Sequence, residues 1–280
     1  MTTGRLAPTP SGLLHLGNVC AFAGAWLSAR QAGGRLLLRV EDIDRERSRG
    51  DVEAALREDL AWLGLTYDSE TPPQSTRSYD EALHRLSTRL YRCRCTRAMR
   101  EQPTPPGAGC PGDCAAHRYD TGALRFRLDS TPMTFEDRRW GVQQVVDPRA
   151  FGDPILVRRD GQVSYNLAVV ADDIIDGVDD VVRGSDLLDY TVVQVQLWIA
   201  LAARPPRWLH TPLILGADGR KLSKSHGSLH VGAMRAAGAT AADVWTMVLP
   251  WLGVDDATSL GEALPRWRPE AGPRGPITIG

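Results

Sequence analysis

Several features that would assign this chain to a common class are missing from its sequence. No G-x-x-x-x-G-K-[ST] segment occurs, which excludes a P-loop as the phosphate site. No apolar run approaches the ~18 residues that a membrane-spanning helix needs. The first residues also lack the apolar stretch of a signal peptide. We therefore expect a protein of the cytoplasm that makes no contact with a membrane.

Net charge and cysteine are also scarce. The 280 residues carry a formal net charge of −1, so any nucleic-acid partner must be met by a local basic patch. Five cysteines do not make a disulfide scaffold in a chain of this length, and four of them fall between Cys93 and Cys114. Such a cluster is typical of metal binding in a reducing compartment. With 42% hydrophobic and 24% charged residues, the composition is that of an ordinary globular protein.

The spacing of apolar residues predicts an alternation of strands and helices. Short continuous apolar runs fit buried strands, and longer segments repeat apolar positions at helical spacing. This β-α-β-α order predicts an α/β fold with a Rossmann-type, doubly wound parallel sheet. The predicted strands are 4–7, 36–40, 124–128, 155–157 and 213–215, and the predicted helices are 16–31, 51–63, 79–91, 191–201 and 239–252.

Changes in composition divide the chain into five segments. The two halves of the sheet domain are 1–92 and 155–228, and a self-contained, cysteine-bearing insert covers 93–154. A short helical segment follows at 229–265. The tail at 266–280 is rich in Pro and Gly, and we expect it to be disordered.

Two distant motifs have the chemistry of one phosphate site. His15 and Asn18 stand on either side of Gly17 on a turn before the first predicted helix, where side chains and the helix dipole can meet phosphate oxygens. Lys221-Leu222-Ser223-Lys224-Ser225 offers two ammonium groups on a loop flanked by glycines. In nucleotidyl transfer, such donors stabilise the charge that grows in the transition state. The candidate ATP-binding residues are His15, Gly17, Asn18, Lys221, Ser223 and Lys224, and the candidate catalytic ones are His15, Asn18, Lys221 and Lys224.

These motifs resemble the two signatures of class I aminoacyl-tRNA synthetases in their glutamate-type form. The first runs from Ala7 to Asn18, and the second is the lysine loop just described. The segments 39–44, 164–173 and 182–184 also resemble glutamyl-type sequences, so the resemblance covers about 5–231. Asn18 is a departure, because many class I enzymes have a second histidine there, but Asn remains a donor. The resemblance implies the class I synthetase fold, ATP as substrate and Mg²⁺ on its phosphates.

The same resemblance implies an L-glutamate pocket. Two arginines and one glutamate complement the two carboxylates and one ammonium of that substrate. By resemblance, Arg5 holds the side-chain carboxylate, Arg183 the α-carboxylate and Glu41 the amino group. Ala7, Thr9 and Tyr165 complete the expected glutamate-binding set. The alternative is that Arg5 and Glu41 are solvated strand ends. Glutamine is disfavoured as substrate, because its neutral amide would leave one arginine poorly paired.

The insert has its own candidate site. Cys93, Cys95, Cys110 and Cys114 can provide four thiolates for a structural Zn²⁺, with His117 as a competing ligand and free thiols or disulfides as the alternative. Related short glutamyl-type proteins carry zinc in this insert. Arginines beside the cluster could contact RNA phosphates or form a solvated basic face. They are Arg92, Arg94, Arg97, Arg100, Arg118 and Arg125.

Only about fifty-five residues follow Ser225, whereas a full glutamyl-tRNA synthetase has a large helical region after the lysine loop. In this the chain is similar to the short glutamyl-Q tRNA(Asp) synthetases. That resemblance implies the transfer of glutamate to queuosine in the anticodon stem-loop of tRNA(Asp), and we expect the protein to be a monomer. Three alternatives stay open: a truncated glutamyl-tRNA synthetase that charges a 3′ end, a catalytically silent tRNA- or amino-acid-binding paralogue, and a small-molecule nucleotidyltransferase.

Overall fold

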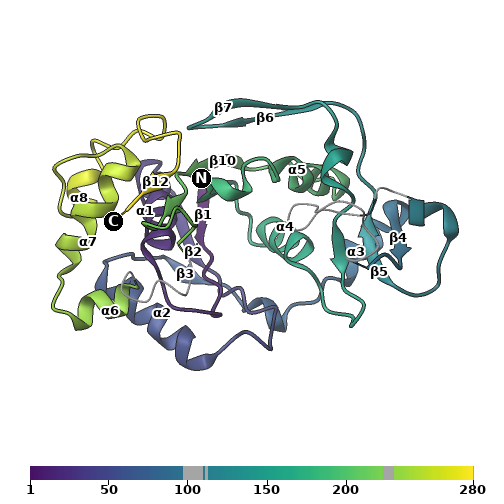
Figure 1. The fold of residues 1–280 in the computed structure, drawn as a ribbon, viewed down its shortest axis with the longest axis horizontal. Helices are drawn as coiled ribbons and strands as arrows, with labels where there is room; N and C mark the ends of the chain where they lie inside the picture. Colours follow the sequence, from purple (N-terminus) through teal and green to yellow (C-terminus); the bar gives the residue numbers. More distant parts are fainter. Residues whose placement is uncertain (97–109, 111–112, 223–229, 280) are drawn as a thin grey trace.

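The computed structural model describes residues 1–96, 110, 113–222 and 230–279. Within these residues, the centre of the molecule is a seven-stranded sheet (Figure 1). Its strands are parallel except for the last pair, which is an antiparallel hairpin. In order across the sheet they are β3 (Ser69–Glu70), β2 (Arg35–Leu38), β1 (Thr3–Leu6), β9 (Asp180–Gly184), β10 (Arg207–Thr211), β6 (Met133–Asp137) and β7 (Gly141–Val145).

The central strands are buried on both faces, as expected for a parallel sheet between two helical layers. Strand β2 shows the alternation: Leu36 and Leu38 belong to one hydrophobic core, and Leu37 belongs to the other. In β9, Val182 packs in the first core and Val181 in the second. The doubly wound α/β prediction is therefore confirmed.

Helices cover both faces of the sheet (Figure 1). The first core is closed by α1 (Leu16–Gln31), α2 (Gly50–Trp62), α6 (Val231–Ala236), α7 (Ala241–Val248) and α8 (Leu260–Ala263). The second is closed by α3 (Asp80–Arg85), α4 (Tyr165–Ile175) and α5 (Thr191–Ala200). Short 3-10 turns occupy Gln74–Thr76, Ser87–Arg89, Asp113–His117, Pro148–Phe151, Ser185–Leu187 and Leu249–Leu252. Among all the residues that the structure describes, no helix is long and apolar enough to cross a membrane.

Helix α1 lies unusually close to the sheet, which places its first turn at the strand ends. A Cβ at Gly24 would come within 3.1 Å of Val182 and 3.2 Å of Thr211, so a side chain there would push the helix away. The boundaries 16–31 predicted for this helix are those observed. The helix predicted at 51–63 is also confirmed, shifted by one residue.

Three expectations about the periphery are wrong. The helix expected at 79–91 ends at Arg85, and Tyr91 lies in β4 (Leu90–Cys93), which pairs with β5 (Ala123–Phe126) and through it with β8 (Ile155–Val157). The insert at 93–154 is not self-contained, because its hairpin β6–β7 joins the main sheet beside β10. The boundaries drawn for the five segments otherwise stay a prediction.

The third correction concerns the tail at 266–280. Its Trp267 is 1% exposed and packs in the first core. Farther on, β12 (Ile277–Thr278) pairs in parallel with β11 (Ile214–Leu215), just before the lysine loop. High Pro and Gly content suggested a disordered tail, but one buried indole and one strand pairing outweigh that local signal.

Candidate active site

A cavity of about 630 Å³ lies at the carboxyl ends of β1 and β9. This is where ligands bind in open α/β sheets. Nine of the predicted site residues line it: Arg5, Ala7, Thr9, His15, Asn18, Glu41, Tyr165, Arg183 and Lys221. Gly17 lies on the first turn of α1, between His15 and Asn18. Ser223 and Lys224 lie outside the described residues.

The turn before α1 fixes the orientation of two side chains. The Nδ1 atom of His15 accepts a hydrogen bond from the backbone N–H of Asn18 at 3.3 Å. In return, the Asn18 Oδ1 atom accepts from the backbone N–H of His15 at 3.2 Å, which completes a capping box. Since Nδ1 and Oδ1 are both acceptors here, the proton of a neutral His15 ring is on Nε2, and the Asn18 amide has its NH₂ group as donor.

Gly17 is needed by this arrangement. A Cβ at that position would lie 3.0 Å from the His15 ring. Across the cavity, Lys221 follows β11 and forms an ion pair with Asp186, which lies in the turn after β9. His15 and Asn18 of the first motif and Lys221 of the second therefore face one cavity, although about two hundred residues separate them.

Arg5 is held at the floor of the cavity by two acceptors. Its Nε donates to Asp173 Oδ1 at 3.2 Å, and one terminal nitrogen donates to the carbonyl of Val182 at 3.2 Å. The side chain is only 5% exposed. A guanidinium has five N–H donors, so three remain for a ligand.

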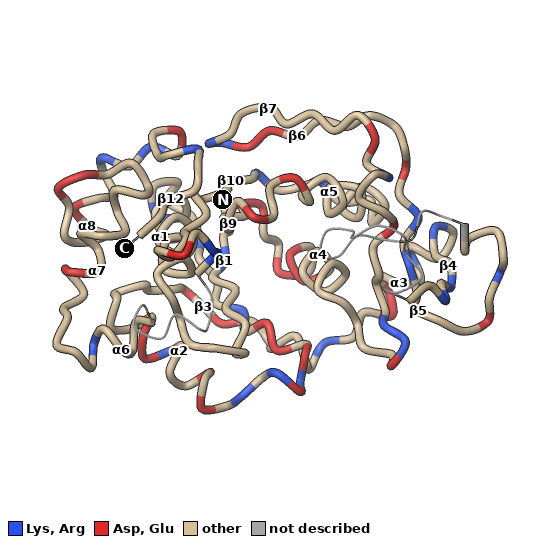
Figure 2. The backbone as a smooth tube through the Cα atoms, viewed as in Figure 1, with Lys and Arg blue, Asp and Glu red and all other residues tan. Residues whose placement is uncertain are grey.

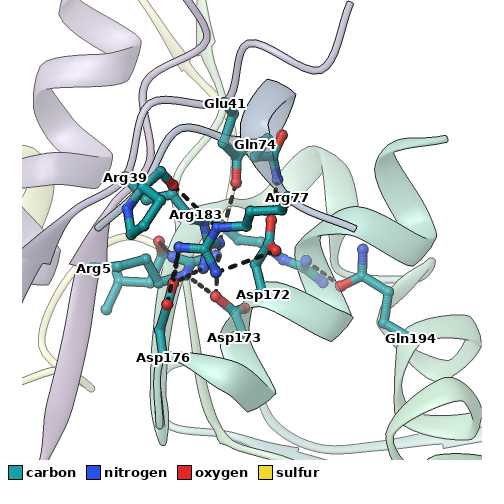
Figure 3. Close-up of polar contacts among 12 residues, drawn as sticks. Arg5, Arg39, Glu41, Gln74, Arg77, Asp172, Asp173, Asp176, Arg183 and Gln194 are labelled. Atoms are coloured by element: carbon teal, nitrogen blue, oxygen red, sulfur yellow. Dashed lines mark hydrogen bonds and ion pairs between the residues drawn. The ribbon is translucent and has the colours of Figure 1, made fainter. Parts of the chain in front are cut away.

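A second buried arginine, Arg39, connects the pocket residues (Figure 3). It donates to Asp173 at 2.7 Å, to Glu41 at 3.3 Å and to Asp176 at 3.2 Å. Burial raises the pKa of Glu41, while the positive charges of Arg39 and Arg5 lower it. Arg39 orients the buried carboxyl group of Glu41 through one oxygen, and the other oxygen can accept from an ammonium group.

Apart from Glu41, the carboxylates that pair with Arg5 and Arg39 come from the C-terminal end of one helix, α4. Asp172, Asp173 and Asp176 lie at the end of α4, where Asp172 is 0% exposed. Arg77 forms ion pairs with Asp172 at 3.3 Å and with Asp176 at 2.9 Å, and the Gln74 amide donates to Asp172 at 2.8 Å (Figure 3). Asp173, which Arg39 also contacts, thereby positions the guanidinium of Arg5, and removing one member of this buried network would leave an uncompensated charge.

Arg183 is oriented by three partners from two other elements. Its Nε donates to His210 Nε2 at 3.0 Å, and its terminal nitrogens donate to Gln194 at 2.5 Å and Thr191 at 2.8 Å. Its guanidinium also lies over the ring of Trp208, 4.8 Å from the centroid. One N–H on each terminal nitrogen remains for a carboxylate, which is the bidentate geometry that arginine favours.

The neutral ring of His210 accepts the hydrogen bond that Arg183 donates. Its Nδ1 lies 2.7 Å from Asp137 Oδ2, and both residues are essentially unexposed. Burial lowers the pKa of His210 to about 4, with the charge of Arg183 acting in the same direction and Asp137 against it. Since Nε2 accepts from Arg183, the ring proton is on Nδ1 and is donated to Asp137. The insert hairpin, through Asp137 in β6, thus supports the pocket.

The four cysteines of the insert converge. The sulfurs of Cys93, Cys95, Cys110 and Cys114 all lie within 4.8 Å of one another, with 3.8 Å between those of Cys95 and Cys110. Zn–S bonds of about 2.3 Å in a tetrahedron put neighbouring sulfurs about 3.8 Å apart, so the geometry fits zinc. His117, the competing ligand, is outside this group in the part of the chain that is described, and its ring stacks on Tyr119.

The arginines predicted to contact RNA have different surroundings. Arg92 and Arg118 are exposed, and Arg94 is exposed with its guanidinium over the Tyr119 ring. The prediction for Arg125 is wrong: its side chain is 1% exposed and donates to the carbonyl of Asp153. Arg97 and Arg100 lie outside the described residues.

Sequence reasoning found the residues that face the ligand but missed those behind them. No role was predicted for Arg39, Asp173, His210 or Asp137. A usable signal was the Asp172-Asp173 pair inside an otherwise apolar helical segment, because unpaired carboxylates are rarely placed in a core.

Comparisons with known proteins agree with this geometry. The family model described as the catalytic domain of class I tRNA synthetases (E and Q) matches residues 1–102 and 116–249. A glutamyl-Q tRNA(Asp) synthetase of Nitratidesulfovibrio vulgaris is 43% identical over 87% of this chain and 84% of its own. A protein of Halorhodospira halophila named glutamate–tRNA ligase 2 is 40% identical over 82% of this chain and 52% of its own.

A solved structure has the same fold. It is a glutamate tRNA ligase from Elizabethkingia meningosepticum, described in complex with its amino acid. The two structures superpose with a TM-score of 0.82 over 100% of this chain and 67% of the other, at 22% identity. The class I synthetase fold predicted from the sequence motifs is thereby confirmed.

Proposed function

We propose that this chain, which belongs to the class I tRNA synthetases of the E and Q type and is therefore a ligase, activates L-glutamate with ATP. In the second step of the proposed reaction, the glutamyl group is transferred to queuosine in the anticodon stem-loop of tRNA(Asp). One observation carries the proposal. A single cavity is lined both by Arg5, Glu41 and Arg183, which complement glutamate, and by His15, Asn18 and Lys221, which suit a triphosphate. The acceptor is supported by the name of the relative from N. vulgaris.

Glutamate would bind between the two arginines. In the proposed pose, Arg5 receives the side-chain carboxylate through its three remaining donors, and Arg183 receives the α-carboxylate through its two. Glu41 accepts from the ammonium group. Glutamine would present a neutral amide to Arg5, which shares Asp173 with Arg39, and would lose charge-assisted hydrogen bonds.

ATP would lie across the first turn of α1. His15 Nε2 and the Asn18 amide donate to phosphate oxygens, and Lys221 exchanges Asp186 for the leaving pyrophosphate. Mg²⁺ would neutralise phosphate charge. Glu41 is the single carboxylate among the described residues of the cavity wall, and Arg39 already holds it, so phosphate oxygens would carry the ion.

The chemistry takes two steps. An oxygen of the glutamate α-carboxylate attacks the α-phosphorus of ATP, a C–O–P anhydride forms, and pyrophosphate leaves with the electron pair of the broken bond. A ring hydroxyl of queuosine then attacks the activated carbonyl carbon, and AMP leaves. The hydroxyl proton passes to the phosphate of the departing AMP, which requires no protein base. Arg183 keeps the α-carboxylate in line during the first step.

The cysteine cluster has a structural role in this proposal. Four thiolates from Cys93, Cys95, Cys110 and Cys114 would hold Zn²⁺ and leave no open position for a substrate. The ion would tie β4 to the turn at Asp113–His117.

The test is to locate the transferred glutamate. The protein is incubated with labelled glutamate, ATP and tRNA(Asp) with or without queuosine, and the RNA is then cleaved. We expect label on the anticodon fragment of queuosine-containing tRNA only. Equal labelling of both tRNAs, or label on the 3′ fragment, would contradict the proposed acceptor.

The second candidate is a glutamyl-tRNA synthetase that charges a 3′ end. The relative from H. halophila, which is named a glutamate–tRNA ligase, favours it. The same cleavage separates the two candidates, because 3′-linked glutamate is released with the terminal adenosine.

A further inference from the structure

A second cavity, of about 440 Å³, lies on the β4–β5 sheet and is strongly basic. We refer to it as the arginine pocket. Figure 2 shows Lys and Arg positions gathered around β4 and β5. Its wall includes four arginines and two tyrosines, and no carboxylate among the residues described. Those six residues are Arg89, Arg92, Arg118, Arg127, Tyr91 and Tyr119.

Two of the arginines are held in place by neutral acceptors. Arg89 donates to the Arg127 carbonyl at 3.0 Å and to the Gln196 side chain at 3.3 Å, and its guanidinium lies 4.4 Å from the Phe126 ring centroid. Arg92 donates to the Gly122 carbonyl at 3.1 Å. These contacts fix the positions of the guanidinium groups without cancelling their charge.

The other two have no carboxylate partner in the described part of the chain. Arg118 and Arg127 are both exposed, and neither forms an ion pair there. Nearby carboxylates are already engaged: Asp153 accepts from the Tyr91 hydroxyl at 2.7 Å, and Asp129 accepts from the backbone of Thr131 at 2.9 Å.

A solvated basic face is the ordinary explanation for surface arginines, and two observations argue against it. Several exposed arginines elsewhere in the described chain pair with carboxylates, as Arg49 does with Asp51 and Arg158 with Asp160. In addition, Arg118 has φ of +47°, in the left-handed region that is costly for a residue with a Cβ. A glycine would relieve that strain, so the side chain at 118 requires a reason.

We propose that the arginine pocket binds backbone phosphates of the RNA substrate. The inference rests on the proposed function, which supplies an RNA as the acceptor of glutamate. Four positive charges, two of them on guanidinium groups held in place, meet few competing carboxylates and suit a polyanion, and arginine forks match phosphate oxygens. The sheet that carries the pocket ends in β8, only eight residues before Tyr165 in the glutamate cavity.

The test separates RNA binding from glutamate activation. Arg118→Gly and Arg127→Ala are combined, and Arg274→Ala, at an exposed arginine on the C-terminal tail, is the matched control. We expect the double variant to raise the KM for tRNA at least tenfold. The slope of log binding against log salt should fall by roughly 1.4 to 1.8, the contribution of two phosphate contacts. Glutamate-dependent pyrophosphate exchange without tRNA, measured on the same preparations, should stay within twofold.

Direct binding keeps the inference testable if the proposed function fails. A fluorescent RNA hairpin with the sequence of the tRNA(Asp) anticodon stem-loop is titrated with each variant, and inorganic phosphate is used as competitor. Weaker hairpin binding by the double variant alone supports the arginine pocket. An unchanged affinity in the double variant overturns it, and so does complete displacement of the hairpin by low-millimolar phosphate, which would indicate a small-anion site. Absence of glutamate-dependent exchange in the unmodified protein would instead refute the proposed function.

Discussion

Replacing His210 should change how the stability of the protein depends on pH. The ring is buried between Arg183 and Asp137, and burial lowers its pKa from 6.5 to about 4. Above pH 6.5 the ring is neutral in the folded and unfolded states, so it contributes no pH dependence. Below 6.5 the unfolded chain takes up a proton that the folded protein refuses, and stability falls until the pH reaches about 4.

The size of the effect follows from the shift. Each pKa unit corresponds to about 1.4 kcal/mol, so the window from 6.5 to about 4 is worth about 3 kcal/mol. In His210→Gln the ring and its titration are gone, but a hydrogen-bonding side chain remains. Near pH 7.5 we expect the variant to be less stable by about 1–3 kcal/mol, because a buried hydrogen-bond network is disturbed. That gap should shrink by about 3 kcal/mol as the pH approaches 4.

The assay is urea unfolding followed by tryptophan fluorescence at several pH values between about 7.5 and about 4. Buried carboxyl groups that do not contact His210 contribute equally to both proteins and cancel in the difference. His84→Gln, at an exposed position on α3, is the control and should keep the unmodified pH dependence. A gap between His210→Gln and the unmodified protein that stays constant over the whole range would refute the reasoning.

Further changes test the other parts of the structure. Asp173→Asn removes the charge between Arg5 and a second buried arginine, so unfolding free energy should fall by about 3–5 kcal/mol and the KM for glutamate should rise; an unchanged urea midpoint would contradict this. Cys110→Ser should lower bound zinc, measured by elemental analysis, and the Tm, as a chelator should in the unmodified protein; Cys20→Ala, outside the cluster, should retain the metal. Trp267→Ala should destabilise the protein by about 3–5 kcal/mol in urea, whereas a disordered tail would give no effect. The chain has only two lysines, Lys221 and Lys224, so their amine-selective acetylation, read by mass spectrometry, should be slower with ATP than in buffer without nucleotide; an equal rate in both would contradict phosphate binding by these lysines.

The residues that contact the ligand were predictable because their chemistry is local. A His/Asn pair around Gly17 forms its capping box within four residues, and the lysine loop carries its charges in five. The apolar periods also predicted α1 and α2 to within a residue, since burial against a sheet is the main determinant of such helices. Four cysteines in a short insert predicted a metal site because all four candidate ligands lie close together in the sequence.

What the sequence by itself determined was therefore the chemistry of the site: which side chains can donate, which carry charge, and in which elements they stand. Only the tertiary structure decided how those side chains are held. Asp173 of helix α4 contacts Arg5 of β1 across 168 positions, and His210 contacts Asp137 on the neighbouring strand across 73; no local pattern reveals either contact. Long-range strand pairing also connects the tail to β11 and the hairpin β6–β7 to β10. Burial of an indole and pairing between distant strands are long-range terms, and they outweigh local composition wherever the two disagree.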